Sequence, residues 1–159
     1  MYCYCGSGNS FAACCQAIIT GEKPAIHCEQ LMRSRYSAYC IKQCDYLFNT
    51  YHVSKRGDNP KHLIQAFANS CHFLQLTIHA SEQNDNDGIV SFTFRYIQDN
   101  FLFEVSEISR FIKAEQWYYR DGKVTEHPVQ KLSRNDLCPC KSGKKVKRCI
   151  DHLPSGQPA

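Results

Sequence analysis

The stretch that decides the fold lies past the middle of the chain and reads Val90-Ser91-Phe92-Thr93-Phe94-Arg95-Tyr96. Large apolar side chains alternate with polar ones, so an extended segment here has one apolar face and one polar face. This period of two predicts a β-strand that is buried on one side. Residues 74–79 repeat the alternation, with Leu, Leu and Ile at every second position, which predicts a second strand.

Two more strands are expected after this pair, at residues 101–112 and 116–120. Turns are predicted at residues 84–88, 99–100, 114–115 and 121–122, where Asn, Asp, Gly and other polar residues interrupt the pattern. Four strands joined by short turns indicate an antiparallel meander.

The segment before the strands has the periodicity of helices. Residues 29–51 carry apolar side chains at helical spacing and predict one helix. Asn59 followed by Pro60 suits an N-cap with proline in the first turn, and predicts a second helix that ends near Ala68. Helices followed by a meander indicate an α+β fold, and the lack of a βαβ crossover disfavours a dinucleotide-binding fold.

Composition sets the size and class of the molecule. The chain has 159 residues, of which 43% are hydrophobic, 12% aromatic and 21% charged, as expected for one globular domain with small appendages. No apolar run approaches the roughly 20 residues of a membrane-spanning helix, and residues 1–13 do not have the pattern of a secretion signal. These features predict a cytoplasmic protein.

Seven of the eleven cysteines lie in two terminal groups, which predict two metal sites. In a reducing compartment, clustered cysteines indicate metal ligation more than disulfides. Both groups have a Cys-x-Cys pair, then eight residues, then a further cysteine, and glycines in each allow the sharp turns that such a pair needs. Thiolates at this spacing suit a tetrahedral zinc ion, so we expect two zinc ions per chain. The expected ligands are Cys3, Cys5, Cys14 and Cys15 at the N-terminus, and Cys138, Cys140, Cys149 and His152 at the C-terminus.

The sequence leaves alternatives for the identity of the fourth ligand in both groups. At the N-terminus either Cys14 or Cys15 can complete the site; both remain candidate ligands, and the alternative is that one of them is a bystander. The position that matches Cys15 is Ile150, which cannot bind zinc, whereas His152 lies three residues after Cys149 on the same helical face. The alternatives are a Cys3His site and a three-thiolate site with water. Because structural zinc sites are closed, we favour His152 and a structural role over a catalytic one.

Four cysteines, Cys28, Cys40, Cys44 and Cys71, lie outside the two groups. Cys40 and Cys44 are four residues apart and could share a helical face as part of a third metal site. Because free cysteine is among the most buried residue types, we favour core packing for all four.

Positive charge is concentrated near the C-terminus. The chain carries +4 in total and the segment from Lys131 to Arg148 carries +6, so the remainder carries −2. An acidic partner would therefore meet this segment first, although a solvated, solubilising surface is the simpler alternative. The cations expected to contact a partner are Lys141, Lys144, Lys145, Lys147 and Arg148.

The two cysteine groups resemble the SEC-C motif, with residues 134–149 the better match. That motif also forms the zinc-binding tail of the SecA translocation ATPase, which implies docking to a translocation chaperone or to ribosomes. With the segments Leu31–Tyr39 and Trp117–Tyr119, the whole chain resembles the YchJ family of uncharacterised bacterial proteins. Membership implies a cone-shaped middle domain similar to nuclear transport factor 2, with helices packed on a curved antiparallel sheet.

The expected organisation is an N-terminal knuckle (residues 1–20), a central domain (residues 28–128) and a C-terminal knuckle (residues 131–153). The leading functional hypothesis is an adaptor that docks a protein or ribonucleoprotein partner through the C-terminal knuckle. The alternative is a small-molecule enzyme whose site is a pocket of the central domain, with His52 and then Glu107 as candidate bases. Its polar lining would come from Arg35, Tyr36, His52, Glu107, Ser109, Trp117 and Tyr119.

Overall fold

The computed structural model describes residues 1–149 and His152. Its helices are α1 (Ala17–Ile19), α2 (Cys28–Cys40), α3 (Cys44–Asn49) and α4 (Lys61–Ser70). Its strands are β1 (His72–Gln83), β2 (Asp87–Gln98), β3 (Phe101–Lys113), β4 (Trp117–Glu126) and β5 (Gln130–Lys131). A π-helical turn at Ala12–Gln16 precedes α1, and 3₁₀ turns lie at Val53–Lys55 and Val146–Arg148.

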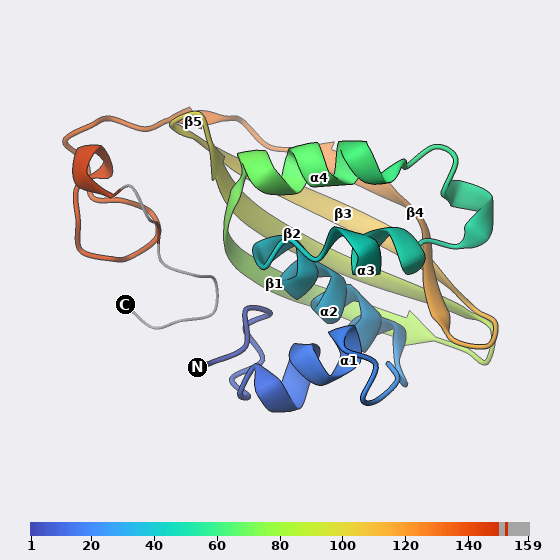
Figure 1. Cartoon of the computed structure of the whole chain (residues 1–159). Helices are drawn as coiled ribbons and strands as arrows, with labels where there is room; N and C mark the ends of the chain where they lie inside the picture. The colour runs from blue at the N-terminus through green and yellow to red at the C-terminus, as the bar shows by residue number, and fades with distance from the viewer. Residues whose placement is uncertain (150–151, 153–159) are drawn as a thin grey trace.

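The strands form one antiparallel sheet in the order β1-β2-β3-β4, with β5 paired to the start of β3. Helices α2, α3 and α4 lie across one face of this sheet (Figure 1). Register shifts between Phe73 and Gln75, Ile78 and Ala80, and Arg110 and Phe111 interrupt the pairing, and such bulges bend the strands that contain them. The predicted α+β fold is confirmed.

The alternation in residues 90–96 has the predicted effect. Val90, Phe92 and Tyr96 are buried on the face that the helices cover, and they belong to the main core together with Leu31 and Met32 of α2. The turn at Asp99-Asn100 is also confirmed, and both residues have positive φ, as the tight turn of a two-residue hairpin requires.

The single helix predicted over residues 29–51 is wrong, because α2 ends at Cys40 and α3 begins at Cys44. Lys42 has a φ of 61° and its N–H donates to the Tyr39 carbonyl, while Gln43 N–H donates to the Ala38 carbonyl. This pair of bonds is a Schellman cap, which usually has glycine where this chain has Lys42. The second helix begins one residue later than expected, because Pro60 is its N-cap and Asn59 precedes the cap.

The turn predicted at Asp121-Gly122 is also wrong, because both residues lie inside β4, opposite Arg110 and Ser109. A side chain on Gly122 would collide with the carboxylate of Glu107. The glycine therefore serves a close approach within the sheet and does not mark a turn.

The two knuckles pack against the central domain at different places. Cys3, Cys5 and Cys15 belong to the main core beside Leu31 and Leu76, so the N-terminal knuckle is part of the folded body. The C-terminal knuckle packs on Ile97 and Leu102 through Leu132 and Val146. Among the described residues, no helix is long and apolar enough to cross a membrane.

Gly88 provides a test of the contact between α2 and the sheet. A Cβ atom at this position would lie 2.6 Å from the Cys28 sulfur and 3.4 Å from the Trp117 ring. We expect Gly88→Ala to lower the free energy of unfolding by about 1–3 kcal/mol through overpacking. For a chain of this size the loss corresponds to a fall in Tm of roughly 2–12 °C, which calorimetry would detect. Gly57→Ala is the matched control, since no atom lies within 4 Å of its Cβ, and equal Tm values for the two variants would contradict the packing.

Candidate functional site

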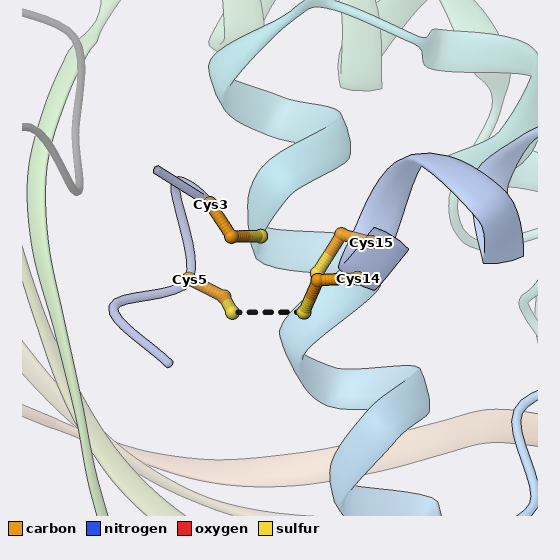
Figure 2. A group of neighbouring side chains, drawn as sticks. All are labelled: Cys3, Cys5, Cys14 and Cys15. Atoms are coloured by element: carbon orange, nitrogen blue, oxygen red, sulfur yellow. Dashed lines mark hydrogen bonds between the residues drawn. The ribbon is translucent and has the colours of Figure 1, made fainter. Parts of the chain in front are cut away.

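The N-terminal knuckle brings four sulfur atoms together. The Sγ atoms of Cys3, Cys5, Cys14 and Cys15 all lie within 4.8 Å of one another, and Figure 2 shows them pointing to a common centre. The Sγ atom of Cys14 is 3.8 Å from that of Cys5 and 3.9 Å from that of Cys15. A tetrahedron with metal–sulfur bonds of about 2.3 Å has edges of roughly 3.8 Å, so these separations fit a bound zinc-like ion.

The backbone fixes this cluster through a tight loop. Gly6 and Gly8 have φ values of 75° and 82°, and Cys3 N–H donates to the Asn9 carbonyl at 2.8 Å. Cys14 departs from helical geometry, with φ −107° and ψ −109° inside the π-helical turn, so that it and Cys15 both face the loop. This irregular turn is why two consecutive cysteines belong to one cluster, where a regular helix would separate them.

The C-terminal knuckle brings together three thiols and an imidazole. Cys138 Sγ lies 3.0 Å from His152 Nδ1, Cys149 Sγ lies 3.4 Å from the same nitrogen, and Cys140 and Cys149 sulfurs are 3.5 Å apart. All four ligand atoms lie within 4.8 Å of one another. The His152 ring also stacks edge-on against His72 of β1, with centroids 4.6 Å apart, which holds it beside the central domain.

The two knuckles repeat the same hydrogen bonds as well as the same sequence pattern. Cys3 N–H to the Asn9 carbonyl corresponds to Cys138 N–H to the Lys144 carbonyl. In the same way Ser7 Oγ lies 3.4 Å from Cys14 Sγ, and Ser142 Oγ lies 3.5 Å from Cys149 Sγ. The fourth donor differs, because Cys15 supplies it in the first knuckle and His152 in the second.

Burial and close contact between the thiols shift the pKa values of the cysteines in both clusters. Burial raises the pKa of the Cys138 thiol to about 12. At the N-terminus the hydrogen bond with Cys15 holds the pKa of Cys5 well below its usual range, whereas bonds to Cys3 and Cys5 raise that of Cys15. These thiols share protons in place of ionising independently. A divalent metal would replace the shared protons and neutralise the thiolates.

The remaining cysteines do not form another cluster. Within residues 1–149 and His152, three or more potential metal ligands lie close together at the two terminal groups described above. Cys28 and Cys71 are buried, while Cys40 and Cys44 are half-buried. The backbone N–H of Cys28 donates to Oε1 of Gln83 at 2.8 Å, which fixes the start of α2 to the end of β1.

The predicted cations of the C-terminal knuckle are all exposed. Lys141, Lys144, Lys145, Lys147 and Arg148 border the loop between the second and third cysteines. Lys147 donates to the Asn135 side chain at 2.9 Å. Because the loop is pinned to the cluster by Ser142 and by the backbone of Cys138, these charges are displayed on an ordered turn.

A separate cavity of about 160 Å³ lies between the helices and the inner face of the sheet. Its walls are mainly aromatic and include Tyr36, Tyr39, Tyr51, Phe67, Phe73, Phe92, Phe94 and Tyr119. Five of the seven residues expected to line a pocket do so: Arg35, Tyr36, Glu107, Ser109 and Tyr119.

The other two lie elsewhere. His52 caps the 3₁₀ turn, with Nδ1 2.7 Å from Ser54 Oγ, and Trp117 donates from Nε1 to the Ile26 carbonyl at 3.3 Å. Neither belongs to the cavity lining. His52 and Glu107 are therefore not gathered around one space, and Glu107 alone of the two candidate bases faces the cavity.

Comparison with known proteins identifies the family to which this chain belongs. The family described as YchJ, middle NTF2-like domain, matches residues 27–122. The chain belongs to the YchJ family. The SEC-C motif matches residues 134–149, which are the C-terminal copy of the repeat. Two UPF0225 relatives agree along nearly the whole chain: YchJ of Shigella dysenteriae is 42% identical and a protein of Enterobacter sp. (strain 638) is 40% identical, each over 92% of this chain and 95% of the relative.

Two solved structures are similar to this YchJ-family chain. A SEC-C motif containing protein from Rhodopseudomonas palustris has a TM-score of 0.73 and 32% identity, and covers 77% of this chain and 98% of its own. A second, from Psychrobacter arcticus, has a TM-score of 0.69 and 23% identity, and covers 94% of both chains. The second likeness concerns the fold alone.

Most of the aromatic wall of the YchJ-family cavity, apart from Tyr36 and Tyr119, was missed in the sequence. Tyr39, Phe67 and Phe73 lie on three different elements, and aromatic residues at those positions are equally consistent with an ordinary core. The one available signal was the number of polar-tipped aromatics, since a buried tyrosine hydroxyl usually requires a partner or a cavity.

The buried tyrosines of the cavity predict how stability depends on alkaline pH. Burial raises the pKa of Tyr39 and of Tyr119, and the charge of Glu107 raises that of Tyr119 further. The unfolded chain releases these protons near pH 10, so the stability that they contribute is present below about pH 10 and is lost as the pH rises above it. Tyr39→Phe should make this decline shallower, by up to about 1.4 kcal/mol per pH unit. Urea unfolding from about pH 8 to pH 11 would measure both slopes, and identical slopes would contradict the assignment.

Proposed function

We propose that the protein is a zinc-binding adaptor that holds two structural zinc ions and docks a protein or ribonucleoprotein partner through its C-terminal knuckle. The observation that carries the proposal is the pair of four-donor clusters, the second of which is bordered by five exposed cations.

Zinc is the metal that the donors favour. Thiolates and imidazole are ligands for zinc, and four of them at tetrahedral separations close its coordination sphere. A closed sphere has no position for a reacting water, which supports a structural role at both ends. Cysteines that bind a metal must stay reduced, so we infer a reducing compartment, the cytoplasm.

Docking through the C-terminal knuckle is supported by its charge and its order. A metal-fixed loop presents Lys144, Lys145, Lys147 and Arg148 together, so binding an acidic surface does not require the loop to be ordered first. The likeness of residues 134–149 to the SEC-C motif makes a translocation chaperone or the ribosome the first partners to test.

A second candidate function, a small-molecule enzyme, is favoured by the aromatic cavity with Glu107 in its wall. Glu107 would then act as the base. Turnover of a compound that binds the cavity, lost in Glu107→Gln, would favour this function over the adaptor.

The metal count is the first test. Elemental analysis of freshly reduced protein should give about two zinc ions per chain, and Cys5→Ser and Cys140→Ser should each remove about one. Cys71→Ser is the control, because this buried cysteine lies outside both clusters and its loss should leave the count unchanged. Fewer than one zinc per wild-type chain would overturn the zinc assignment.

Docking is tested by removing charge while keeping the metal. We expect the variant with Lys144, Lys145, Lys147 and Arg148 replaced by glutamine to keep two zinc ions and to bind its partner more weakly. For a ribosomal partner, co-sedimentation at about 50 to 200 mM salt should give a dependence of log affinity on log salt that is shallower by roughly 3 to 4.

The matched control removes four exposed lysines from other surfaces: Lys23, Lys42, Lys61 and Lys123. Its net charge equals that of the knuckle variant, so a purely nonspecific attraction would weaken equally in both. Partner binding that is unaltered in the knuckle variant would show that the basic loop only solubilises the protein.

A further inference from the structure

The cavity contains a buried cation that has no anionic partner. Arg35 is 5% exposed, and no carboxylate of the described chain lies within ion-pair distance of its guanidinium. Burying an unpaired charge is costly, and proteins keep such groups mainly where they are well hydrogen-bonded or serve a site. The position of Arg35 in the cavity wall is therefore informative about what the cavity binds.

The guanidinium is held rigidly by one of its edges. Nη1 donates to the Leu47 carbonyl at 2.7 Å and to Thr50 Oγ1 at 2.6 Å. The rings of Tyr51 and Tyr119 lie 4.5 and 4.8 Å from its central carbon. These contacts fix the plane of the group and use only Nη1 for hydrogen bonds within the described chain, so its other nitrogens can donate to a ligand.

Glu107 is held just as firmly and also has one free side. Ser109 Oγ donates to its Oε1 at 2.7 Å, and Tyr119 donates to the same oxygen at 2.5 Å. Gly122 allows the carboxylate to rest against β4. Both bonds end on Oε1, which leaves Oε2 as an acceptor for a ligand.

Size and charge narrow the class of ligand. At about 160 Å³ the cavity is close to the roughly 150 Å³ of an engineered cavity that holds benzene, so it accommodates one six-membered ring. Its aromatic walls suit a flat ring. Since Arg35 and Glu107 contribute +1 and −1, an uncharged ligand leaves the cavity neutral, whereas an ion of either sign would not.

We propose that the central cavity binds an uncharged, planar, single-ring compound whose edge carries a carbonyl and an adjacent N–H, as in an amide or a lactam. The carbonyl accepts from the guanidinium of Arg35, and the N–H donates to Oε2 of Glu107. The ring lies among the aromatic walls. This site is independent of zinc and of docking, so either proposal can fail without the other.

The test uses three probes that share one ring and differ in charge: benzamide, benzoate and benzylammonium. Binding to the full-length, zinc-loaded protein is followed by the chemical shifts of cavity residues. Benzamide should bind about tenfold more tightly than either ion, which corresponds to one paired polar contact. Glu107→Gln removes the negative charge and leaves Arg35, so the preference should change to benzoate.

Glu104→Gln is the matched control, because Glu104 lies on the same strand but outside the cavity lining and should leave the preference unaltered. The Gly122→Ala variant provides a second test of the site. Its methyl group would displace the Glu107 carboxylate without changing any charge, and benzamide binding should fall at least about tenfold. No binding of benzamide at millimolar concentration, or the same order of the three probes in Glu107→Gln as in the wild type, would overturn the proposal.

Discussion

The guanidinium of Arg35 joins parts of the central domain that are far apart in the sequence. It projects from α2, donates to Leu47 and Thr50 at the end of α3, and lies against Tyr119 of β4. Without these contacts a buried charge would cost several kcal/mol, so the helices cannot shift relative to β4 without losing them. Backbone bonds support the same junction, since Tyr119 N–H donates to the Thr50 carbonyl and His52 N–H donates to the Tyr119 carbonyl. The cavity lies beside this junction, and the same cation forms part of its wall.

The sequence predicted the strands of the sheet because the alternation of apolar and polar residues within each strand is enough to indicate a strand. The alternation in residues 90–96 depends on one property, burial on one face, and the strand followed it. Two errors arose where the residue type did not reveal the backbone conformation. Lys42 adopts the conformation usually taken by glycine and ends α2, and Gly122 lies within β4 because the Glu107 carboxylate needs its space. A single sequence does not distinguish a glycine that turns the chain from one that admits a neighbour.

The two ligand clusters could be predicted from the sequence, whereas the lining of the cavity could be predicted only in part. The reason is how far apart in the sequence the residues of each site lie. Ligands in each knuckle lie within fifteen residues of one another, so their spacing almost determines their geometry. The cavity is assembled from α2, α4 and four strands, and Phe67 or Phe92 would look the same in a solid core. His52 shows the converse, because a histidine beside aromatic residues proved to cap a turn through Ser54.

The C-terminal knuckle packs on an apolar patch at the end of β2 and the start of β3. Ile97 and Leu102 are 3% and 6% exposed, and residues from Leu132 onward provide their cover. Protein synthesis proceeds from the N-terminus, so the four long strands leave the ribosome before the segment that shields this patch. A chain whose C-terminal segment has not yet folded therefore exposes the apolar side chains of Ile97 and Leu102 to solvent. Folding of the C-terminal segment is therefore the step that closes the apolar core at this end of the sheet.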